Sequence, residues 1–299
     1  MRRKPLELQV FEYISRRKSL SEAESNKYRK LRRGYEGEVL FESYVTGLSD
    51  QLLSIGDIWL SCNGKFFQID HLLFGKNTIY LYEIKNFPGE YYYENDKLYV
   101  RSGKLMDDPL TQLQRCETLF AQLLEKLRVH VPIQAAVVFV NPECTLFQAP
   151  LSSRIILPTQ LNYYFKQFQE SNKLHPTFNK LAEKLNTIRL AEPPYQQLPE
   201  FHYQELKKGI PCKWCHHFCT REGKLCHCAN CGQLETVQSA IMRMVTEFKT
   251  LYPEEPVTRS RLLDWCENMV TTKQISYTLQ KHFNIEGTGR GSHYVESRT

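Results

Sequence analysis

The sequence has no long uninterrupted hydrophobic run among its 299 residues. None of its apolar stretches approaches the roughly 20 residues that are needed to span a bilayer. The first four residues, MRRK, lead into Glu7 and Glu12 and not into the apolar core of a secretion signal. We therefore expect no membrane span and no secretion, which places the chain in the cytoplasm, where disulfides are disfavoured.

A strong excess of one charge is also missing, since 39 Lys and Arg face 33 Asp and Glu, a net charge of +6. The excess is uneven: residues 1–38 hold 11 basic and 6 acidic side chains, residues 39–199 hold 15 and 16, and residues 200–299 hold 13 and 11. A basic N-terminal segment is typical of a protein with a polyanionic partner such as nucleic acid. Solvated helical faces account for the same charge, so both interpretations stay open.

Hydrophobic periodicity predicts an α/β fold whose first part has the order helix, three strands, helix, strand. A helical period covers the first 48 residues, a period of two follows, and a fully apolar run predicts a central strand covered on both faces. The residues Asp108-Pro109 are typical of a helix N-terminus. The predicted segments after residue 48 are the strands Ile58–Cys62, Phe66–Phe74 and Thr78–Lys85, a helix that starts at Pro109, and the strand Ile133–Val140.

The second and third predicted strands bring two carboxylates together. If the turn between them is an even-numbered loop centred on residues 76 and 77, the numbers of opposed residues add to 153, and Asp70 faces Glu83. Directly opposed side chains have Cβ atoms roughly 4.5–5.5 Å apart, so the two carboxylates need a proton or a cation between them. Mg²⁺ meets this need, and Lys85, on the same face as Glu83, would orient water or stabilise a phosphate. The competing interpretation is a solvated Glu–Lys ion pair.

The neighbouring His71 has two interpretations as well. It could bind phosphate, or it could satisfy a hydrogen bond within the core, and we favour the second.

This region resembles the nuclease-related domain (NERD) family, over about residues 34–150. The motifs that carry the resemblance are Gly34-Tyr-Glu-Gly-Glu38, Gln68-Ile-Asp-His71, Glu83-Ile-Lys-Asn-Phe-Pro-Gly89 and Asp108-Pro-Leu-Thr-Gln112. That family is assigned to the restriction-endonuclease-like superfamily with its PD-(D/E)xK active site. The resemblance implies Asp70 and Glu83 as metal ligands, Lys85 as the catalytic lysine, Glu38 as the acidic residue of the first helix and Gln112 as a polar helper. Ile69 stands where the PD motif has proline.

Six of the ten cysteines fall between positions 212 and 231 and predict a metal site. Two Cys-x2-Cys pairs, separated by 12 residues, have the spacing of a structural zinc ribbon with four thiolate ligands. The predicted ligands are Cys212, Cys215, Cys228 and Cys231. Five further donors in the same segment compete with them: Cys219, Cys226, His216, His217 and His227. The exposed loop mixes basic and aromatic residues that could touch nucleic acid, and a closed structural clip is the alternative.

The C-terminal part has two helical patterns, Arg259 to Asn268 and Thr272 to Phe283, and then a glycine-rich turn. This order resembles part of a winged helix-turn-helix, in which Thr272 to Ser276 would start the recognition helix and Arg290 would contact phosphate. A small helical subdomain is the alternative.

These observations lead to one functional hypothesis and its rival. We predict a Mg²⁺- or Mn²⁺-dependent nuclease that cleaves DNA, although nothing in the sequence excludes RNA. The rival is a non-catalytic nucleic-acid-binding or regulatory protein that uses the nuclease fold as a scaffold. The predicted division is a basic helical segment (1–33), a NERD domain (34–150), an α/β extension (151–190), a linker (191–208), a zinc ribbon (209–233) and a helical tail (234–299), for which a winged helix is one interpretation.

Overall fold

The computed structural model describes residues 2–46, 48, 52–151, 154–168, 176–287 and 292–296. Its contacts divide the chain into two compact units. The first unit comprises residues 1–3 and 30–196, and the second comprises residues 4–29 and 197–299. Each unit therefore combines an N-terminal piece with a later one, and the finer six-part division stays a prediction.

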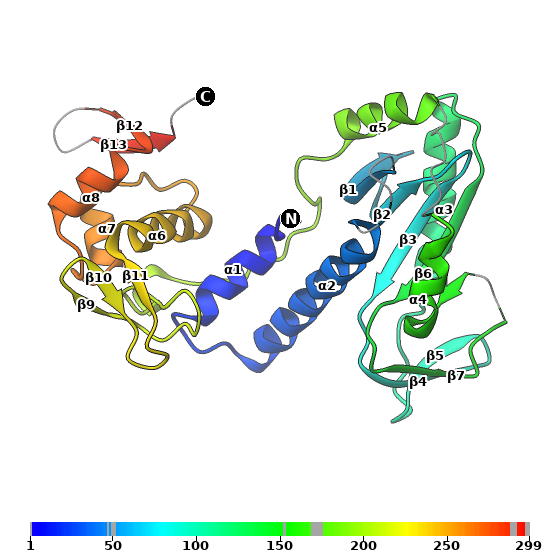
Figure 1. The fold of residues 1–299 in the computed structure, drawn as a ribbon, viewed down its shortest axis with the longest axis horizontal. Coiled ribbons are helices and arrows are strands. Elements are labelled where there is room, and N and C mark those ends of the chain that lie inside the picture. Colours follow the sequence, from blue (N-terminus) through cyan, green and yellow to red (C-terminus); the bar gives the residue numbers. More distant parts are fainter. Residues whose placement is uncertain are drawn as a thin grey trace. The chain divides into compact units, whose positions relative to one another are not determined.

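The first unit is a mixed α/β structure around a five-stranded sheet (Figure 1). The strand order is β1-β2-β3-β6-β8; β1, β2 and β3 run antiparallel, whereas β3, β6 and β8 are parallel. The predicted order of helix, three strands, helix and strand agrees with these elements. The strands are β1 (Leu53–Cys62), β2 (Lys65–Phe74), β3 (Ile79–Lys85), β6 (Ile133–Phe139) and β8 (Ile155–Ile156).

Helices cover both faces of this sheet, because the side chains of its central strand alternate between two hydrophobic clusters. Val137 and Phe139 of β6 pack in one cluster with the helices α3 (Pro109–Lys126) and α5 (Thr177–Ile188). Val138 packs in the other cluster with α2 (Glu22–Thr46) and α4 (Leu161–Lys166), which follows the short 3-10 helix η1 (Pro158–Gln160). Alternation of neighbouring side chains across a strand produces this two-sided core.

Local signals in the sequence start the two long helices α2 and α3, and α3 begins where we expect it. The Asp108 side chain accepts hydrogen bonds from the N–H groups of Leu110 and Thr111, and Pro109 occupies the first position of α3. Ser21 and Glu24 form reciprocal side-chain to backbone hydrogen bonds at the start of α2.

A small second sheet lies outside the predicted elements. It has the order β5-β4-β7, formed by β4 (Gly89–Glu94), β5 (Lys97–Val100) and β7 (Cys144–Phe147). Asn95 and Asp96 both have positive φ, 49° and 57°, which suits a tight hairpin turn.

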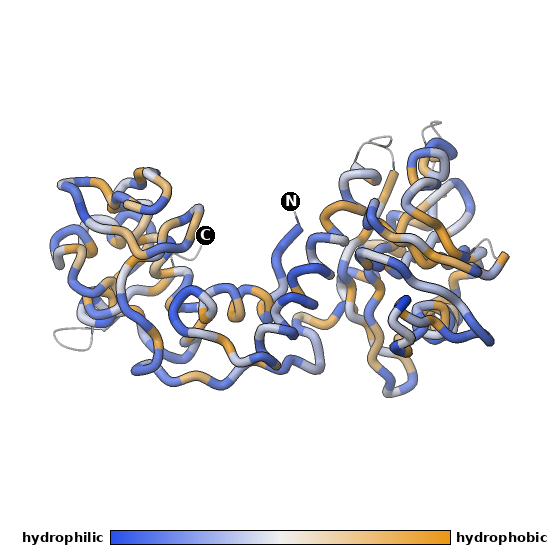
Figure 2. The backbone as a smooth tube through the Cα atoms, turned by 90° about the horizontal axis from the view of Figure 1, so that it is seen from below, coloured by the Kyte–Doolittle hydropathy of each residue, from blue (hydrophilic) through white to orange (hydrophobic). Residues whose placement is uncertain are grey.

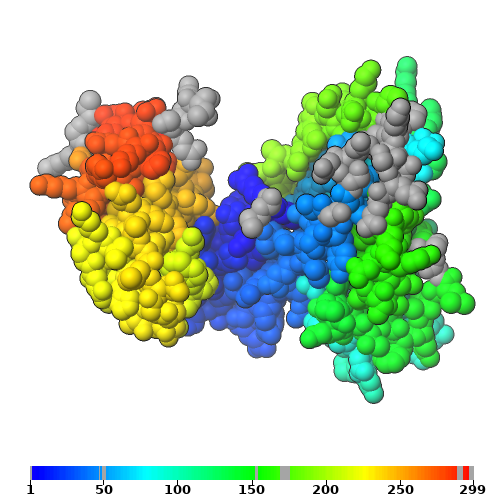
Figure 3. Space-filling view, viewed as in Figure 1, coloured from blue at the N-terminus to red at the C-terminus, as the bar shows by residue number. Residues whose placement is uncertain are grey.

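The second unit is built on helices and a three-stranded sheet, and the N-terminal helix is part of its core. Val10 and Ile14 of α1 are buried with Met244, Phe248 and Trp265. Figure 3 shows the ribbon and the helices after it as one continuous surface, coloured yellow to red. The elements are α1 (Leu6–Ser15), η2 (Tyr203–Glu205), β9 (Thr220–Glu222), β10 (Leu225–His227), β11 (Leu234–Thr236), α6 (Val237–Leu251), α7 (Arg259–Trp265), α8 (Thr272–Leu279), β12 (Phe283–Glu286) and β13 (His293–Glu296).

Most of the N-terminal basic residues lie in ion pairs. At least seven of the 11 basic side chains before residue 39 have a carboxylate partner within 4.0 Å. They are Arg2, Lys4, Arg16, Arg17, Lys18, Lys27 and Arg32. The positive charge of this segment is thus largely balanced within the fold.

In the C-terminal tail, the α7–α8 helix pair is followed by the β12–β13 hairpin, and Tyr294 of β13 also bridges to Val257 ahead of α7. Arg290, which we expect to contact phosphate, lies outside the described residues.

Among the residues that the structure describes, no helix is both long and apolar enough to cross a membrane. Figure 2 shows hydrophobic residues spread over many short elements.

Candidate functional sites

The β2–β3 hairpin has the predicted register and then opens. Its four pairs run from Phe74–Ile79 to His71–Tyr82, and in each pair the residue numbers add to 153. The ladder ends one position before Asp70 and Glu83. There, the Asp70 carboxylate accepts a hydrogen bond from the backbone N–H of Ile84, at 2.8 Å. A side chain thus replaces the backbone partner of β3, which holds Asp70 against that strand.

Glu83 and Lys85 lie on the same face of β3 and contact each other. The Lys85 ammonium nitrogen is 2.6 Å from Glu83 Oε1 and 3.0 Å from Gln112 Oε1, on the first turns of α3. Glu83 is 3% exposed, and only 18% of the Lys85 side chain is exposed. The competing interpretation, a fully solvated Glu–Lys pair, does not describe this location, because Glu83 is buried and Lys85 is partly buried.

Burial makes the carboxylates of this region resist ionisation. The pKa of Glu83 is raised to about 7, mainly by burial and then by the Asp70 charge, although the Lys85 ion pair opposes the shift. Burial also raises the pKa of Asp70, against the Ile84 hydrogen bond and the Lys85 charge. Glu38 has its pKa raised to about 8 by burial and then by Asp70. Grouped carboxylates with raised pKa values indicate a place where a cation would bind favourably.

Glu38 reaches this region from α2 because the helix approaches the sheet closely. A Cβ atom at Gly37 would lie 2.5 Å from Asn86 Cβ and 3.4 Å from Val140 Cγ2. The Glu38 carboxylate forms a 2.6 Å ion pair with Arg2. Because Gly37 has no side chain, α2 can approach the sheet closely, and the neighbouring Glu38 lies near the Asp70 carboxylate.

Asp57 is a residue of this region that the sequence analysis missed. It interrupts the β1–β2 ladder, which pairs Gly56 and Ile58 but not Asp57, and it has a φ of 50°. Its charge raises the pKa of both Asp70 and Glu38. The signal that could have identified Asp57 is its position: it is a charged residue within a strand whose side chains otherwise alternate in burial. We call Glu38, Asp57, Asp70 and Glu83 the acidic cluster.

The expectation for His71 is wrong in one respect. Its ring is 3% exposed and packs 5.0 Å from the Phe41 ring, but neither ring nitrogen has a hydrogen-bond partner in the described structure. Burial lowers the pKa of this imidazole to about 3, helped by the Arg2 charge. His71 is therefore a neutral core side chain without the core hydrogen bond that we expected.

The four predicted cysteine ligands form a second site, in the second unit. Their sulfur atoms all lie within 4.8 Å of one another, and the pairs Cys212–Cys231 and Cys215–Cys228 are 3.6 and 3.3 Å apart. Four thiolates around a tetrahedral zinc ion, each at about 2.3 Å, lie about 3.8 Å from one another. The thiols are therefore close enough to hold a metal ion such as zinc.

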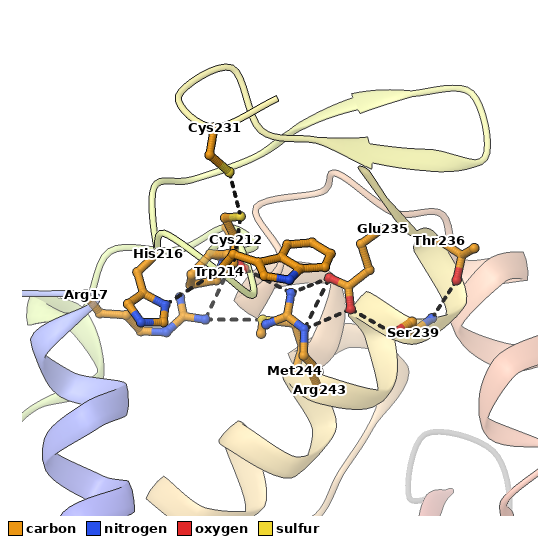
Figure 4. A network of polar contacts seen from close by, with 12 residues as sticks. Arg17, Cys212, Trp214, His216, Cys231, Glu235, Thr236, Ser239, Arg243 and Met244 are labelled. Atoms are coloured by element: carbon orange, nitrogen blue, oxygen red, sulfur yellow. Dashed lines mark hydrogen bonds and ion pairs between the residues drawn. The ribbon is translucent and has the colours of Figure 1, made fainter. Parts of the chain in front are cut away.

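Two knuckles with the same backbone pattern present these thiols. In each, the residue after the second cysteine, His216 or Gly232, has a positive φ of 65° or 70°. Its N–H donates to the carbonyl of the first cysteine, at 3.2 Å for His216 and 2.8 Å for Gly232. In the first knuckle, the backbone N–H of Trp214 also points at the Cys212 sulfur, at 3.5 Å, and such donors help to lower the pKa of that thiol. Figure 4 shows Cys212 and Cys231 facing each other across the two knuckles.

The competing donors lie elsewhere. Cys219 and Cys226 are buried free thiols that belong to the core of the unit and not to the four-sulfur group. The His216 and His217 ring nitrogens contact backbone carbonyls, whereas His227 contacts Glu222. The structure therefore brings together the same four cysteines that the double Cys-x2-Cys spacing predicts as ligands, and these four thiols could hold a metal ion.

A partly buried ion pair fixes the ribbon to α6. The Arg243 guanidinium donates to Glu235 (Figure 4). It also donates, at 2.9 Å, to the Pro211 carbonyl just before the first knuckle. Ser239 also donates to Glu235, at 2.7 Å. The ribbon is thus a braced part of the second unit.

Taken together, the fold and sites define a mixed α/β protein with an acidic cluster, in which Glu83 is buried and the other three carboxylates are partly buried, and a separate four-cysteine centre. Residues 33–140 match the family model of the nuclease-related domain, NERD. This match confirms the resemblance predicted from the motifs. No curated protein and no solved structure matches the chain.

Proposed function

We propose that this protein is a divalent-metal-dependent nuclease that cleaves DNA phosphodiester bonds. The observation that carries the proposal is the opening of the hairpin at Asp70 and Glu83, with Lys85 held between Glu83 and Gln112. This arrangement, in the order helix, three strands, helix and strand, supports a restriction-endonuclease-like core. The match to a nuclease-related domain covers all five of the proposed site residues.

The donor set fits a hard cation such as Mg²⁺ or Mn²⁺. Both proposed ligands, Asp70 and Glu83, offer carboxylate oxygens, which these ions prefer. One Asp70 oxygen accepts from Ile84, and this bond fixes the carboxylate beside β3. Burial raises the pKa of both carboxyl groups, with the Asp70 charge adding to the shift at Glu83, and a bound divalent cation would offset these effects.

The side chains around these ligands have separate proposed roles. The bound ion would supply Lewis-acid stabilisation of phosphate charge. Lys85 would orient the attacking water and stabilise negative charge on the phosphate, while the Gln112 oxygen fixes the direction of its ammonium group. Glu38 would assist as a further acidic group, with its orientation set by Arg2.

The second unit would hold the nucleic acid. We propose a structural zinc ion at Cys212, Cys215, Cys228 and Cys231, because four protein ligands leave no open position for water. Next to it, Lys213 lies near the ring of Trp214, which is 50% exposed and suited to stack on a base.

The tail adds a second candidate surface for nucleic acid. Helices α7 and α8, the β12–β13 hairpin and the Val257 bridge support a winged helix-turn-helix. In this interpretation Thr272, Lys273, Gln274 and Ser276 start the recognition helix α8. We place the protein in the cytoplasm.

The test compares cleavage of plasmid and linear DNA, with RNA in parallel, by the wild type and by the Asp70→Asn and Lys85→Ala variants in Mg²⁺ or Mn²⁺. Two exposed residues give matched controls: Glu36→Gln removes a carboxylate of α2, and Lys76→Ala removes a lysine of the β2–β3 turn. Loss of cleavage in the site variants alone supports the proposal. Equal cleavage in all proteins refutes the assigned residues. Salt-sensitive DNA binding without any cleavage favours the rival, a non-catalytic nucleic-acid-binding protein.

A further inference from the structure

Arg2 is a buried cation beside the acidic cluster. Its side chain is only 4% exposed; Nη2 lies 2.6 Å from Glu38 Oε2, and Nη1 donates to Glu42 Oε1 at 3.2 Å. The Tyr35 hydroxyl donates to the Arg2 carbonyl at 3.1 Å and holds its backbone. A buried arginine with this many fixed contacts is a structural element of the cluster and not a solvated surface charge.

The guanidinium of Arg2 fits beside β1 because residue 56 is a glycine. A Cβ atom on Gly56, in β1, would lie 2.8 Å from Arg2 Nη1 and 3.4 Å from His71 Nδ1. Any larger residue at this position would have to displace the arginine head group. The sequence of β1 is therefore compatible with Arg2 in this place only because position 56 has no side chain.

A second fixed cation lies on the β3 side of the cluster. The Lys85 ammonium nitrogen is 2.6 Å from Glu83 Oε1, and its side chain is 18% exposed. Two fixed cations thus flank the cluster, one near Glu38 and one near Glu83.

Resting on the proposed function, we propose that Arg2 takes the place of a second cation, so that the acidic cluster binds one divalent metal ion and not two. When ionised, the four carboxylates of the cluster carry two more negative charges than Arg2 and Lys85 neutralise, and one divalent ion cancels this difference. Glu42, the other partner of Arg2, is not counted because its side chain is 29% exposed and is solvated outside the cluster. With Arg2 in place, Glu38 already has its cation. Without Arg2, Glu38 and Asp57 would offer their oxygens to a second ion.

The experiment counts bound Mn²⁺ by the loss of the free-ion signal in electron paramagnetic resonance, using the full chain with its cysteine site loaded with zinc. We expect one Mn²⁺ per wild-type chain, none in Asp70→Asn and two in Arg2→Gln. Arg3→Gln removes the same charge from the neighbouring, exposed residue and should still bind one. A purely structural role for Arg2 would leave the stoichiometry at one.

A second variant tests the same inference without changing residue 2. Gly56→Ala places a methyl group against Arg2 Nη1, and it should also raise the stoichiometry from one to two. If the wild type binds one ion and both Arg2→Gln and Gly56→Ala still bind one, the role of Arg2 is refuted while the metal site stands. Two ions in the wild type refute it as well. If the wild type binds none, the proposed metal-dependent function itself fails.

Discussion

Replacing Arg17 by methionine should destabilise the second unit strongly, because this side chain neutralises a buried carboxylate. The Arg17 side chain is 0% exposed and that of its partner, Glu247 of α6, is 1% exposed. Arg17 also donates to the carbonyls of Lys207, at 2.6 Å, and Gly209, at 3.3 Å, and its guanidinium lies 3.9 Å from the Trp265 ring centre. One side chain therefore joins the segment after α1 to three parts of the C-terminal chain.

The magnitude follows from what Glu247 must do without its partner. A buried carboxylate avoids an unpaired charge by taking up a proton, and this costs about 1.36 kcal/mol for each pH unit above the ordinary glutamate pKa of about 4.3. The penalty is about 3.7 kcal/mol at pH 7 and about 1 kcal/mol at pH 5. Two carbonyls that lose a donor add about 1 kcal/mol each. We expect a total loss of roughly 5–6 kcal/mol at pH 7 and roughly 3 kcal/mol at pH 5.

The sign of the pH dependence makes the reasoning testable. In Arg17→Met the folded state binds a proton that the unfolded state releases above pH 4.3, so stability falls as pH rises. Hydrogen exchange of α6, with α3 of the first unit as internal reference, measures the loss unit by unit. Arg17→Met with Glu247→Gln should lose the pH dependence and keep only the carbonyl penalty. Arg32→Met, which breaks an exposed pair with Glu36, should cost less than about 1 kcal/mol. A loss in Arg17→Met below about 1 kcal/mol, or one that does not change between pH 5 and pH 8, would refute the argument.

Two further predictions concern single positions. Cys228→Ser should release about one zinc ion per chain, counted by elemental analysis, and should expose the amides of β9–β11 to hydrogen exchange. The control variant Cys219→Ser should keep its zinc. Equal zinc in both variants would contradict the ligand assignment. Gly37→Ala should destabilise the first unit by about 1–3 kcal/mol in urea denaturation because its Cβ would lie 2.5 Å from Asn86 Cβ. Gly34→Ala on the same helix meets nothing within 4 Å and should stabilise by about 0.5–1 kcal/mol; the same sign for both would show that helix propensity, and not packing, dominates.

The sequence predicted the parts of the sheet in which side-chain pattern and backbone pairing agree. Phe74 and Ile79 close a four-residue turn, so the register of the β2–β3 pairs follows from counting. Counting could not predict where the ladder ends. The end of the ladder depends on the Asp70 carboxylate, because this side chain accepts the hydrogen bond of the Ile84 N–H. In a continued ladder that N–H would not bond to a side chain. Asp57 was missed for a related reason, because its positive φ breaks the alternation on which the strand prediction rests.

Sequence spacing determines the four-cysteine centre much more than it determines the acidic cluster. The four clustered cysteines come from two local turns of four residues, and the backbone of each turn fixes the direction of its thiols. The acidic cluster combines residues from α2, β1, β2 and β3, so its assembly depends on tertiary packing. The family resemblance supplied Glu38 as a candidate, but Arg2 could not be foreseen, since its contact with Glu38 joins positions 36 residues apart.

The distribution of charge in the fold also changes the expectation drawn from the basic N-terminal segment. Val10 and Ile14 show by their spacing that α1 has a buried face, but this pattern does not say that α6, more than 200 residues later, covers it. Because Arg2 is paired with the partly buried Glu38 and Arg17 with the buried Glu247, deleting residues 1–33 would disturb both units and would not isolate an effect on DNA binding. Cations that meet a polyanion should therefore be sought on exposed side chains such as Lys213, where a substitution leaves the core intact.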